Sequence, residues 1–264
     1  MEAAFFDLDK TIIATSSVIA FGGPFYREGL IAKRTIARGI YAQFVYMLVG
    51  ADESKMERMR ESMLRLTRGW EQARIRAIVE DTLEATLSPI IYAEALELIA
   101  QHNAEGRTTV IISSSPIEVV EPLARHLGVD GVIATRAEVD ESGRYTGELE
   151  FYAYGPHKAE AIRELALRDG LDLAASYAYS DSITDLPMLE MVGHPVVVNP
   201  DRELARVART REWEVRKFER PVRLRDRMPA PSRGSALAAA AALGTVGAGV
   251  GGYLWLRRRT APAS

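Results

Sequence analysis

Apolar residues gather in five short runs with the length of buried strands, at residues 3–6, 109–112, 131–135, 176–179 and 195–198. The segments between them repeat apolar residues at helical spacing, as at residues 123–127, 158–167 and 186–192. Continuous apolar strands that alternate with amphipathic helices are typical of a parallel sheet built from crossover connections. The pattern therefore predicts an α/β fold.

One long segment breaks this alternation. From residue 16 to about residue 87 the pattern is helical and contains no convincing strand, with glycine-containing breaks at residues 22–24 and 50–52. Because the segment follows the first strand directly, we expect a helical insertion over residues 16–87. The core would then consist of residues 1–15 and 88–218. Within it, residues 138–151 have the pattern of a β-hairpin.

The C-terminal region has a different character. Residues 235–256 carry no charged side chain, a length that suffices to cross a bilayer. Gly247 and Gly251 have the spacing found where membrane helices touch. We expect a single transmembrane helix here, after a basic, proline-containing linker at residues 219–234. It would anchor the chain to the cell membrane with the rest in the cytoplasm; a flexible Ala/Gly tail is the alternative.

Composition narrows the classes of function. The net charge of the 264 residues is -3, which gives no reason to expect nucleic acid as a partner. The absence of cysteine excludes disulfides and thiolate metal sites and fits a reducing compartment. The first residues lack a basic region followed by an apolar run, so we expect no cleaved secretory signal.

Two carboxylates follow the first predicted strand. Side chains alternate along an extended segment, so Asp7 and Asp9 project to the same side of the strand's carboxyl end. In open α/β sheets this end is where ligands bind. Two acids placed so close together need a cation, most simply a metal ion. The pair therefore predicts a site.

Further polar residues follow other predicted strands. Ser113 ends the second apolar run, at a strand–helix turn of the kind that suits a phosphate, and Lys158 opens a predicted helix. Asp181 and Asp185 follow the run at residues 176–179. Taken singly, these residues are explained as helix caps or surface positions. Taken together, they offer a nucleophile, a proton carrier, a metal site and donors to phosphate, as phosphoryl transfer requires.

The order and spacing of these residues resemble the haloacid dehalogenase (HAD) superfamily. The match is to subfamily IB, the phosphoserine phosphatase-like branch, through Asp7-Leu8-Asp9-Lys10-Thr11, Ser113, Lys158 and the pair Asp181 and Asp185. The resemblance covers about residues 3–218. It implies a Rossmann-like core with a parallel sheet, and it makes the helical insertion the cap of that branch.

The resemblance also implies roles for the matched residues. Asp7 would be the nucleophile that forms an aspartyl-phosphate. Asp9 would protonate the leaving oxygen and then activate water. Mg2+ would be held by Asp7, the backbone carbonyl of Asp9 and Asp181, with Asp185 supporting the metal from behind. Phosphate would be held by Thr11, Ser113 and Lys158.

Three departures from the family pattern bear on the substrate. Ser16 stands where phosphoserine phosphatases carry a glutamate that meets the substrate amine. Ser114-Ser115 replaces a glycine pair, and Ser180 replaces the glycine before Asp181. Together these departures argue against phosphoserine.

We therefore expect a Mg2+-dependent phosphatase that hydrolyses a phosphomonoester at the membrane surface, with a lipid-linked substrate as one candidate. A soluble small-metabolite phosphatase, phosphoserine-like, is the first alternative. A catalytically silent regulatory or scaffold protein with the same fold is the second. The physiological substrate, the membrane orientation and the oligomeric state stay open.

Overall fold

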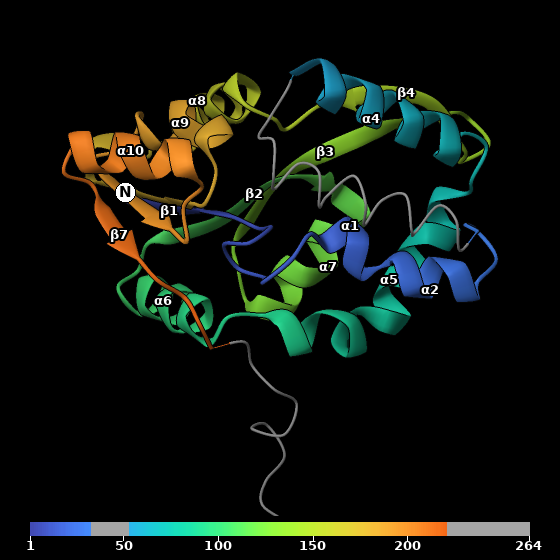
Figure 1. Cartoon of the computed structure of the whole chain (residues 1–264), viewed down its shortest axis with the longest axis horizontal. Coiled ribbons are helices and arrows are strands. Elements are labelled where there is room, and N and C mark those ends of the chain that lie inside the picture. The colour runs from blue at the N-terminus through green and yellow to red at the C-terminus, as the bar shows by residue number, and fades with distance from the viewer. Residues whose placement is uncertain (33–52, 221–264) are drawn as a thin grey trace, which may run out of the picture. The chain divides into compact units, whose positions relative to one another are not determined.

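A seven-stranded sheet organises the computed structural model, which describes residues 1–32 and 53–220 (Figure 1). The strand order is β4-β3-β2-β1-β5-β6-β7. The bounds are β1 Ala3–Asp7, β2 Thr108–Pro116, β3 Gly131–Val139, β4 Tyr145–Phe151, β5 Tyr177–Ser180, β6 His194–Val198 and β7 Glu214–Arg216. All neighbours in the sheet pair in parallel except β3 and β4, which are antiparallel. The predicted α/β fold with a mostly parallel sheet is confirmed.

Strand β1 lies at the centre of the sheet. It pairs with β2 on one side and with β5 on the other, so that Phe5 lies between Val110 and Ala178. All five of its residues are buried. A strand buried on both faces has no polar alternation, which explains the uninterrupted run Ala-Ala-Phe-Phe before Asp7.

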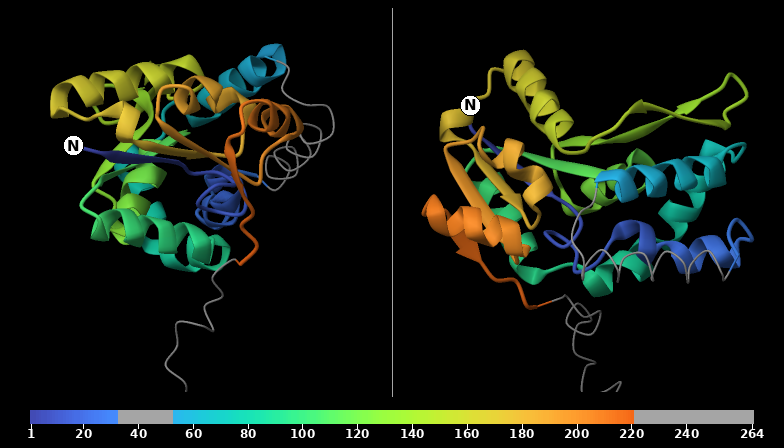
Figure 2. Two further views of the ribbon diagram at one scale, coloured as in Figure 1. Left: turned by 90° about the vertical axis from the view of Figure 1, so that its left-hand side faces the viewer. Right: turned by 45° about the horizontal axis from the view of Figure 1, so that its top comes forward.

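Helices cover both faces of the sheet, as the views in Figure 2 show for α8 and α6. The helices described are α1 Ser17–Ala20, α2 Gly22–Arg27, α4 Glu53–Thr67, α5 Gln72–Leu87, α6 Ala93–Ala104, α7 Ile117–Leu127, α8 Pro156–Asp169, α9 Leu186–Leu189 and α10 Arg202–Thr210. Short 3-10 turns lie at Ser88–Ile90 (η1), Leu173–Ala175 (η2) and Ile183–Asp185 (η3).

The hydrophobic core forms two clusters, one on each face of the sheet. Phe6 packs with Leu98 of α6 and Leu123 of α7, whereas its neighbour Phe5 packs with Ile162 of α8 and Leu204 of α10. Consecutive strand residues point to opposite faces, so β1 contributes to both clusters. This packing holds the carboxyl end of β1 in a fixed position.

The five predicted strands all form, with two differences. Residues 131–135 and the first arm of the predicted hairpin at residues 138–151 form one continuous strand, β3, which pairs with β4. Strand β7 was not predicted, because it has three residues and two of them are exposed. Its sequence, Glu-Val-Arg, has no apolar run to indicate a strand.

The predicted insertion is helical in its described part. Between β1 and β2 the chain forms α1, α2, α4, α5, η1 and α6, and no strand of the sheet comes from the described residues of 16–87. Met1–Val222 form one compact unit. The exact boundaries between core and cap therefore stay a prediction.

The predicted membrane helix at residues 235–256 lies outside the described residues, as does most of the predicted linker at residues 219–234. Among the residues that are described, no helix is both long and apolar enough to cross a membrane.

Gly193, directly before β6, lies very close to the backbone of Ala174. Its amide donates to the carbonyl of Leu173 at 2.9 Å, and a Cβ at Gly193 would lie 1.7 Å from the carbonyl oxygen of Ala174. Because backbone must move to admit a methyl group, we expect Gly193→Ala to lower the free energy of unfolding by about 1–3 kcal/mol, measured by urea denaturation.

The matched control is Gly23→Ala in α2. A Cβ there would meet only the Arg27 side chain, at 3.8 Å. If both variants unfold at the same urea concentration, the close approach at Gly193 has no energetic weight.

Candidate functional site

The carboxyl ends of β1, β2 and β5 bring the predicted residues to one edge of the sheet. Asp7 is the last residue of β1, and its register partner in β2, Ile112, directly precedes Ser113. Asp181 follows the last residue of β5, and Lys158 lies in the first turn of α8. All four side chains belong to buried residues. Parallel strands that end together thus concentrate polar groups in an otherwise apolar sheet.

The side chain of Lys158 is the centre of this arrangement. Its Nζ lies 2.6 Å from Oδ1 of Asp7 and 2.8 Å from Oδ2 of Asp185. The hydroxyl of Ser180 donates to the same Asp185 oxygen at 2.7 Å. The side chain of Lys158 is 4% exposed, so both ion pairs are formed away from water and are screened little by salt.

The charges around Lys158 do not balance. Burial raises the pKa of Asp7 well above its usual range; Lys158 opposes this shift, and the carboxylate of Asp185 adds to it. Burial also raises the pKa of Asp181 to about 7, although Lys10 lies close and opposes the shift. The Nζ of Lys10 is 4.0 Å from Oδ2 of Asp181.

The pKa of Lys158 shifts in the complementary direction. Burial alone would lower it, but the carboxylates of Asp185 and Asp7 outweigh burial and raise it above the usual lysine value. Lys158 therefore stays an ammonium. The edge of the sheet still carries more negative than positive charge, and this is an environment that favours a cation.

Asp9 lies in a different environment from Asp7. Its Oδ1 accepts the backbone N–H of Ser17 at 2.9 Å, and its Oδ2 accepts the hydroxyl of Ser115 at 3.2 Å. Burial raises the pKa of Asp9, and the hydrogen bonds from Ser17 and Ser115 oppose the shift. No ion pair between Asp9 and a Lys or Arg side chain is found among the described residues. Asp9 is held by neutral donors.

The loop after Asp9 turns tightly. The carbonyl of Leu8 accepts the amides of Ile12 at 2.9 Å and Ile13 at 3.1 Å, and Lys10 has a φ of 63°. Thr11 is 1% exposed, and its hydroxyl has no hydrogen-bond partner among the described residues. A buried hydroxyl without a partner costs about 1–3 kcal/mol. Formation of this loop beside the carboxylates therefore costs folding free energy.

The hydroxyl oxygen of Ser113 already has a hydrogen-bond partner within the chain. Its Oγ accepts the backbone N–H of Ser115 at 3.1 Å, and the residue is 1% exposed. An oxygen that already accepts still has one O–H to donate. Ser113 is thus suited to donate to an anion at this edge.

A metal ion would find few ligands here. No group of three or more His, Cys, Asp or Glu residues in the described ranges is arranged to hold a metal. Asp7 and Asp181 supply two carboxylates, and a backbone carbonyl such as that of Asp9 is the third oxygen predicted. Mg2+ is usually held by one or two carboxylates together with waters and substrate phosphate, so this donor set fits it.

Four residues around the site were not assigned a role from the sequence. Ser17, Ser115 and Ser180 contact the site carboxylates, and Asp201 braces the loop after β5 by accepting the amides of Ile183 and Leu204. Ser115 and Ser180 stand where the family has glycine, and Asp201 stands at a helix start, whereas Ser17 has no signal in the sequence. Neither signal indicates which side chain they contact.

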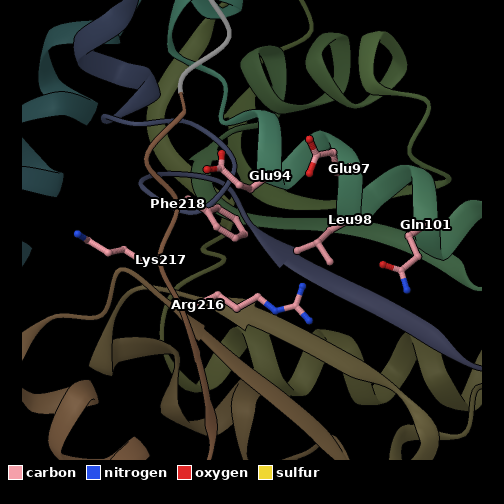
Figure 3. A pocket seen from close by; sticks show the side chains of 7 residues that line it. All are labelled: Glu94, Glu97, Leu98, Gln101, Arg216, Lys217 and Phe218. Atoms are coloured by element: carbon pink, nitrogen blue, oxygen red, sulfur yellow. The ribbon is translucent and has the colours of Figure 1, made fainter.

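A groove of about 310 Å³ lies elsewhere, over α6 and the segment after β7 (Figure 3). Its lining residues are Glu94, Glu97, Leu98, Gln101, Arg216, Lys217 and Phe218. Glu94 accepts the backbone amides of Glu219 and Arg220, so the groove lies beside hydrogen bonds that hold the segment after β7 against α6. None of the predicted site residues lines it.

Comparison with known proteins identifies the family. The model of haloacid dehalogenase-like hydrolases matches residues 4–190. A probable phosphatase of Mycobacterium tuberculosis, Rv3661, is 53% identical over 258 residues, covering 97% of this chain and 89% of that protein. The phosphoserine phosphatase SerB1 of the same organism is 37% identical over 250 residues, covering 93% of this chain and 79% of that protein.

A solved structure shares the fold. It is a phospho-aspartyl intermediate analogue of phosphoserine phosphatase, with a TM-score of 0.58 and 17% identity, covering 85% of this chain and 96% of that one. The chain is therefore phosphoserine phosphatase-like in sequence and in fold.

The raised pKa of Asp181 predicts how stability depends on pH without metal. Its folded pKa, about 7, exceeds the usual value for aspartate. The folded state therefore binds more protons than the unfolded state between these values, and stability is lost as the pH rises through about 7. In EDTA, we expect the free energy of unfolding to be lower at pH 8 than at pH 5, by about 1.4 kcal/mol per unit of pKa shift at most.

Asp181→Asn should flatten this dependence, whereas Asp81→Asn, at an exposed position of α5, should leave it unchanged. Urea denaturation at both pH values measures the difference. An Asp181→Asn protein with the wild-type slope would show that Asp181 does not titrate as described.

Proposed function

Since the chain belongs to the haloacid dehalogenase-like hydrolase family, we propose that it hydrolyses a phosphomonoester in two steps through an aspartyl-phosphate on Asp7. One observation carries the proposal. A buried ammonium, that of Lys158, contacts the Asp7 carboxylate at 2.6 Å, while the second acid of the motif, Asp9, is held apart by neutral donors. A nucleophile and a proton carrier in separate environments are what this reaction needs.

In the first step an oxygen of Asp7 attacks phosphorus. The new Asp7 O–P bond forms as the bond from phosphorus to the leaving oxygen breaks, and Asp9 gives its proton to that oxygen. Lys158 holds Oδ1 of Asp7 and so orients the carboxylate for attack. Its charge also offsets repulsion between the carboxylate and the phosphoryl oxygens.

In the second step Asp9 acts in the opposite direction. Water attacks phosphorus, Asp9 takes a proton from it, and the bond between phosphorus and Asp7 breaks. Inorganic phosphate leaves and both carboxylates return to their starting states. The same side chain serves as acid and then as base because its proton is replaced in each cycle.

Phosphate would be bound by Lys158 with the hydroxyls of Ser113 and Thr11. The Oγ of Ser113 already accepts an amide and has its proton to donate, and the buried hydroxyl of Thr11 has no partner in the described part of the chain. A bound phosphoryl group would satisfy such donors. This supports the phosphate-binding set proposed from the sequence.

Mg2+ would be held by the side chains of Asp7 and Asp181 and by the backbone carbonyl of Asp9, with Asp185 supporting the site through Lys158. Bound there, Mg2+ supplies positive charge to a phosphoryl oxygen. The raised pKa values of Asp7 and Asp181 support this assignment, because they reflect negative charge that a divalent cation would offset.

A small metabolite is better supported as the substrate than a membrane lipid. The relative SerB1 is named a phosphoserine phosphatase, and the name of Rv3661 refers to neither lipid nor membrane. We propose a small phosphomonoester of the phosphoserine type, although Ser16 replaces the glutamate that meets the amine in that branch. A location at the membrane and a lipid-linked substrate stay predictions. A silent scaffold is disfavoured, because Asp7, Asp9 and Lys158 are all present.

Removing the nucleophile tests the reaction. Asp7→Asn should abolish Mg2+-dependent release of phosphate from an aryl phosphate, because an amide cannot form the acyl phosphate. Asp9→Asn should lower kcat by about 10²- to 10⁴-fold, as expected for loss of a general acid–base group. Asp81→Asn is the control on α5 and should release phosphate at the wild-type rate. Activity that survives Asp7→Asn would refute the covalent mechanism.

A substrate panel tests the small-metabolite assignment. We expect a higher kcat/KM for phosphoserine and similar small phosphomonoesters than for a lysophosphatidic acid below its micellar concentration. The measurement uses the full chain with Mg2+, with release of inorganic phosphate as the common readout. The reverse preference would favour the membrane-surface enzyme predicted from the sequence.

A further inference from the structure

Two serines from distant parts of the chain enclose the carboxylate of Asp9. Ser17 begins α1 and Ser115 lies near the end of β2, 98 residues further along the chain, yet their hydroxyl oxygens are 2.7 Å apart. Ser17 is 0% and Ser115 3% exposed. Both contact Asp9: Ser17 through its backbone amide and its side chain, and Ser115 through its hydroxyl.

The hydrogen bonds have a fixed direction when Asp9 is ionised. A carboxylate only accepts, so the hydroxyl proton of Ser115 is donated to Oδ2 of Asp9. A serine has one hydroxyl proton, so the oxygen of Ser115 must accept from Ser17. The chain of donors thus runs from Ser17 through Ser115 to Asp9.

Both oxygens of Asp9 are thereby occupied. The amide of Ser17 holds Oδ1 at 2.9 Å and the hydroxyl of Ser115 holds Oδ2 at 3.2 Å. Contacts at both oxygens fix the plane of the carboxylate as well as its position. This matters because Asp9 lies beyond the end of β1, directly before the tight turn at Lys10, so the sheet itself does not hold its side chain.

We propose that Ser115, supported by the hydroxyl of Ser17, is a positioning residue that holds the Asp9 carboxyl group in place to protonate the leaving oxygen. The proposal rests on the function proposed above, in which Asp9 is the proton carrier. Proton transfer requires heavy atoms within about 2.6–3.2 Å, so a carboxylate free to rotate would reach that geometry less often. Neither serine touches phosphorus or the nucleophile in this scheme.

The leaving group provides a selective test. An alkoxide leaves poorly and depends on protonation by Asp9, whereas an aryl oxide with electron-withdrawing groups leaves with little help. We expect Ser115→Ala to lower kcat/KM for an alkyl phosphate about 10- to 100-fold, the effect of misplacing a catalytic group. For nitrophenyl phosphate the loss should be only a few-fold. A general disturbance of the site would reduce both substrates equally.

A double-mutant cycle tests the direction of the donor chain. Ser17→Ala keeps the backbone amide that holds Oδ1 but removes the hydroxyl that supports Ser115. Its effect on the alkyl phosphate should be smaller than that of Ser115→Ala. If the Ser17 hydroxyl acts through Ser115, the double variant should match Ser115→Ala within about two-fold; additive losses would show that Ser17 holds Asp9 directly and would refute this donor chain.

Ser88→Ala is the matched control. Ser88 is 2% exposed, and its hydroxyl has no partner among the described residues, so the variant removes a buried hydroxyl outside the site. It should keep wild-type kinetics on both substrates. Thermal unfolding of each variant shows whether it is folded. If Ser115→Ala does not fold, Ser17→Ala still tests the proposal.

The results separate this inference from the proposed function. Wild-type protein that releases no phosphate from either substrate overturns the proposed function and this inference with it. An active wild type refutes the inference alone if Ser115→Ala loses nothing, or if it loses the same factor on alkyl and aryl phosphates. A loss confined mainly to the alkyl phosphate supports it.

Discussion

The ion pairs of Lys158 are the contact on which the candidate site depends. Burying one carboxylate without a partner is costly, and here Asp7 and Asp185 are both buried at the end of a sheet. One ammonium at 2.6 Å and 2.8 Å makes that possible. The order of the strands makes these ion pairs possible. Asp7 ends β1 and Asp185 follows β5, so the two strands must be neighbours for both carboxylates to reach Lys158. Loss of Lys158 would leave both buried carboxylates without their cation.

Two aspartates two residues apart have opposite surroundings. Asp7 contacts a cation, which opposes the rise in pKa that burial causes. Asp9 contacts an amide and a hydroxyl, which carry no net charge and offset part of the rise in pKa that burial causes. A nucleophile benefits from the first environment and a proton carrier from the second. The fold produces this difference because β1 ends between Asp7 and Asp9, so that only Asp7 lies in the sheet beside Lys158.

The sequence was enough to predict the strands and the helical insertion. It also predicted the residues that lie around Lys158, because those residues follow apolar runs and parallel strands end at one edge of the sheet. It was not enough to assign Ser17, Ser115 and Ser180. Their roles depend on contacts between segments up to 106 residues apart, and a serine at a strand end is also an ordinary helix cap. Strand β7 was missed because its pairing with β6, rather than its own composition, makes it a strand. The membrane helix predicted at residues 235–256 stays untested.

The central place of β1 has a consequence for how the protein is made. Chains emerge from the ribosome N-terminus first, so the four apolar residues of β1 exist before either of their neighbours in the sheet. The first neighbour begins at Thr108 and the second at Tyr177. Until both of these strands are made, β1 has at least one unpaired edge, and the helices from the C-terminal half of the chain do not yet cover it. Asp7 is synthesised before Lys158, and the two cannot meet until the 151 residues that separate them have emerged. Catalytic competence therefore arrives late in synthesis, and the intervening period is when this chain is most exposed to aggregation.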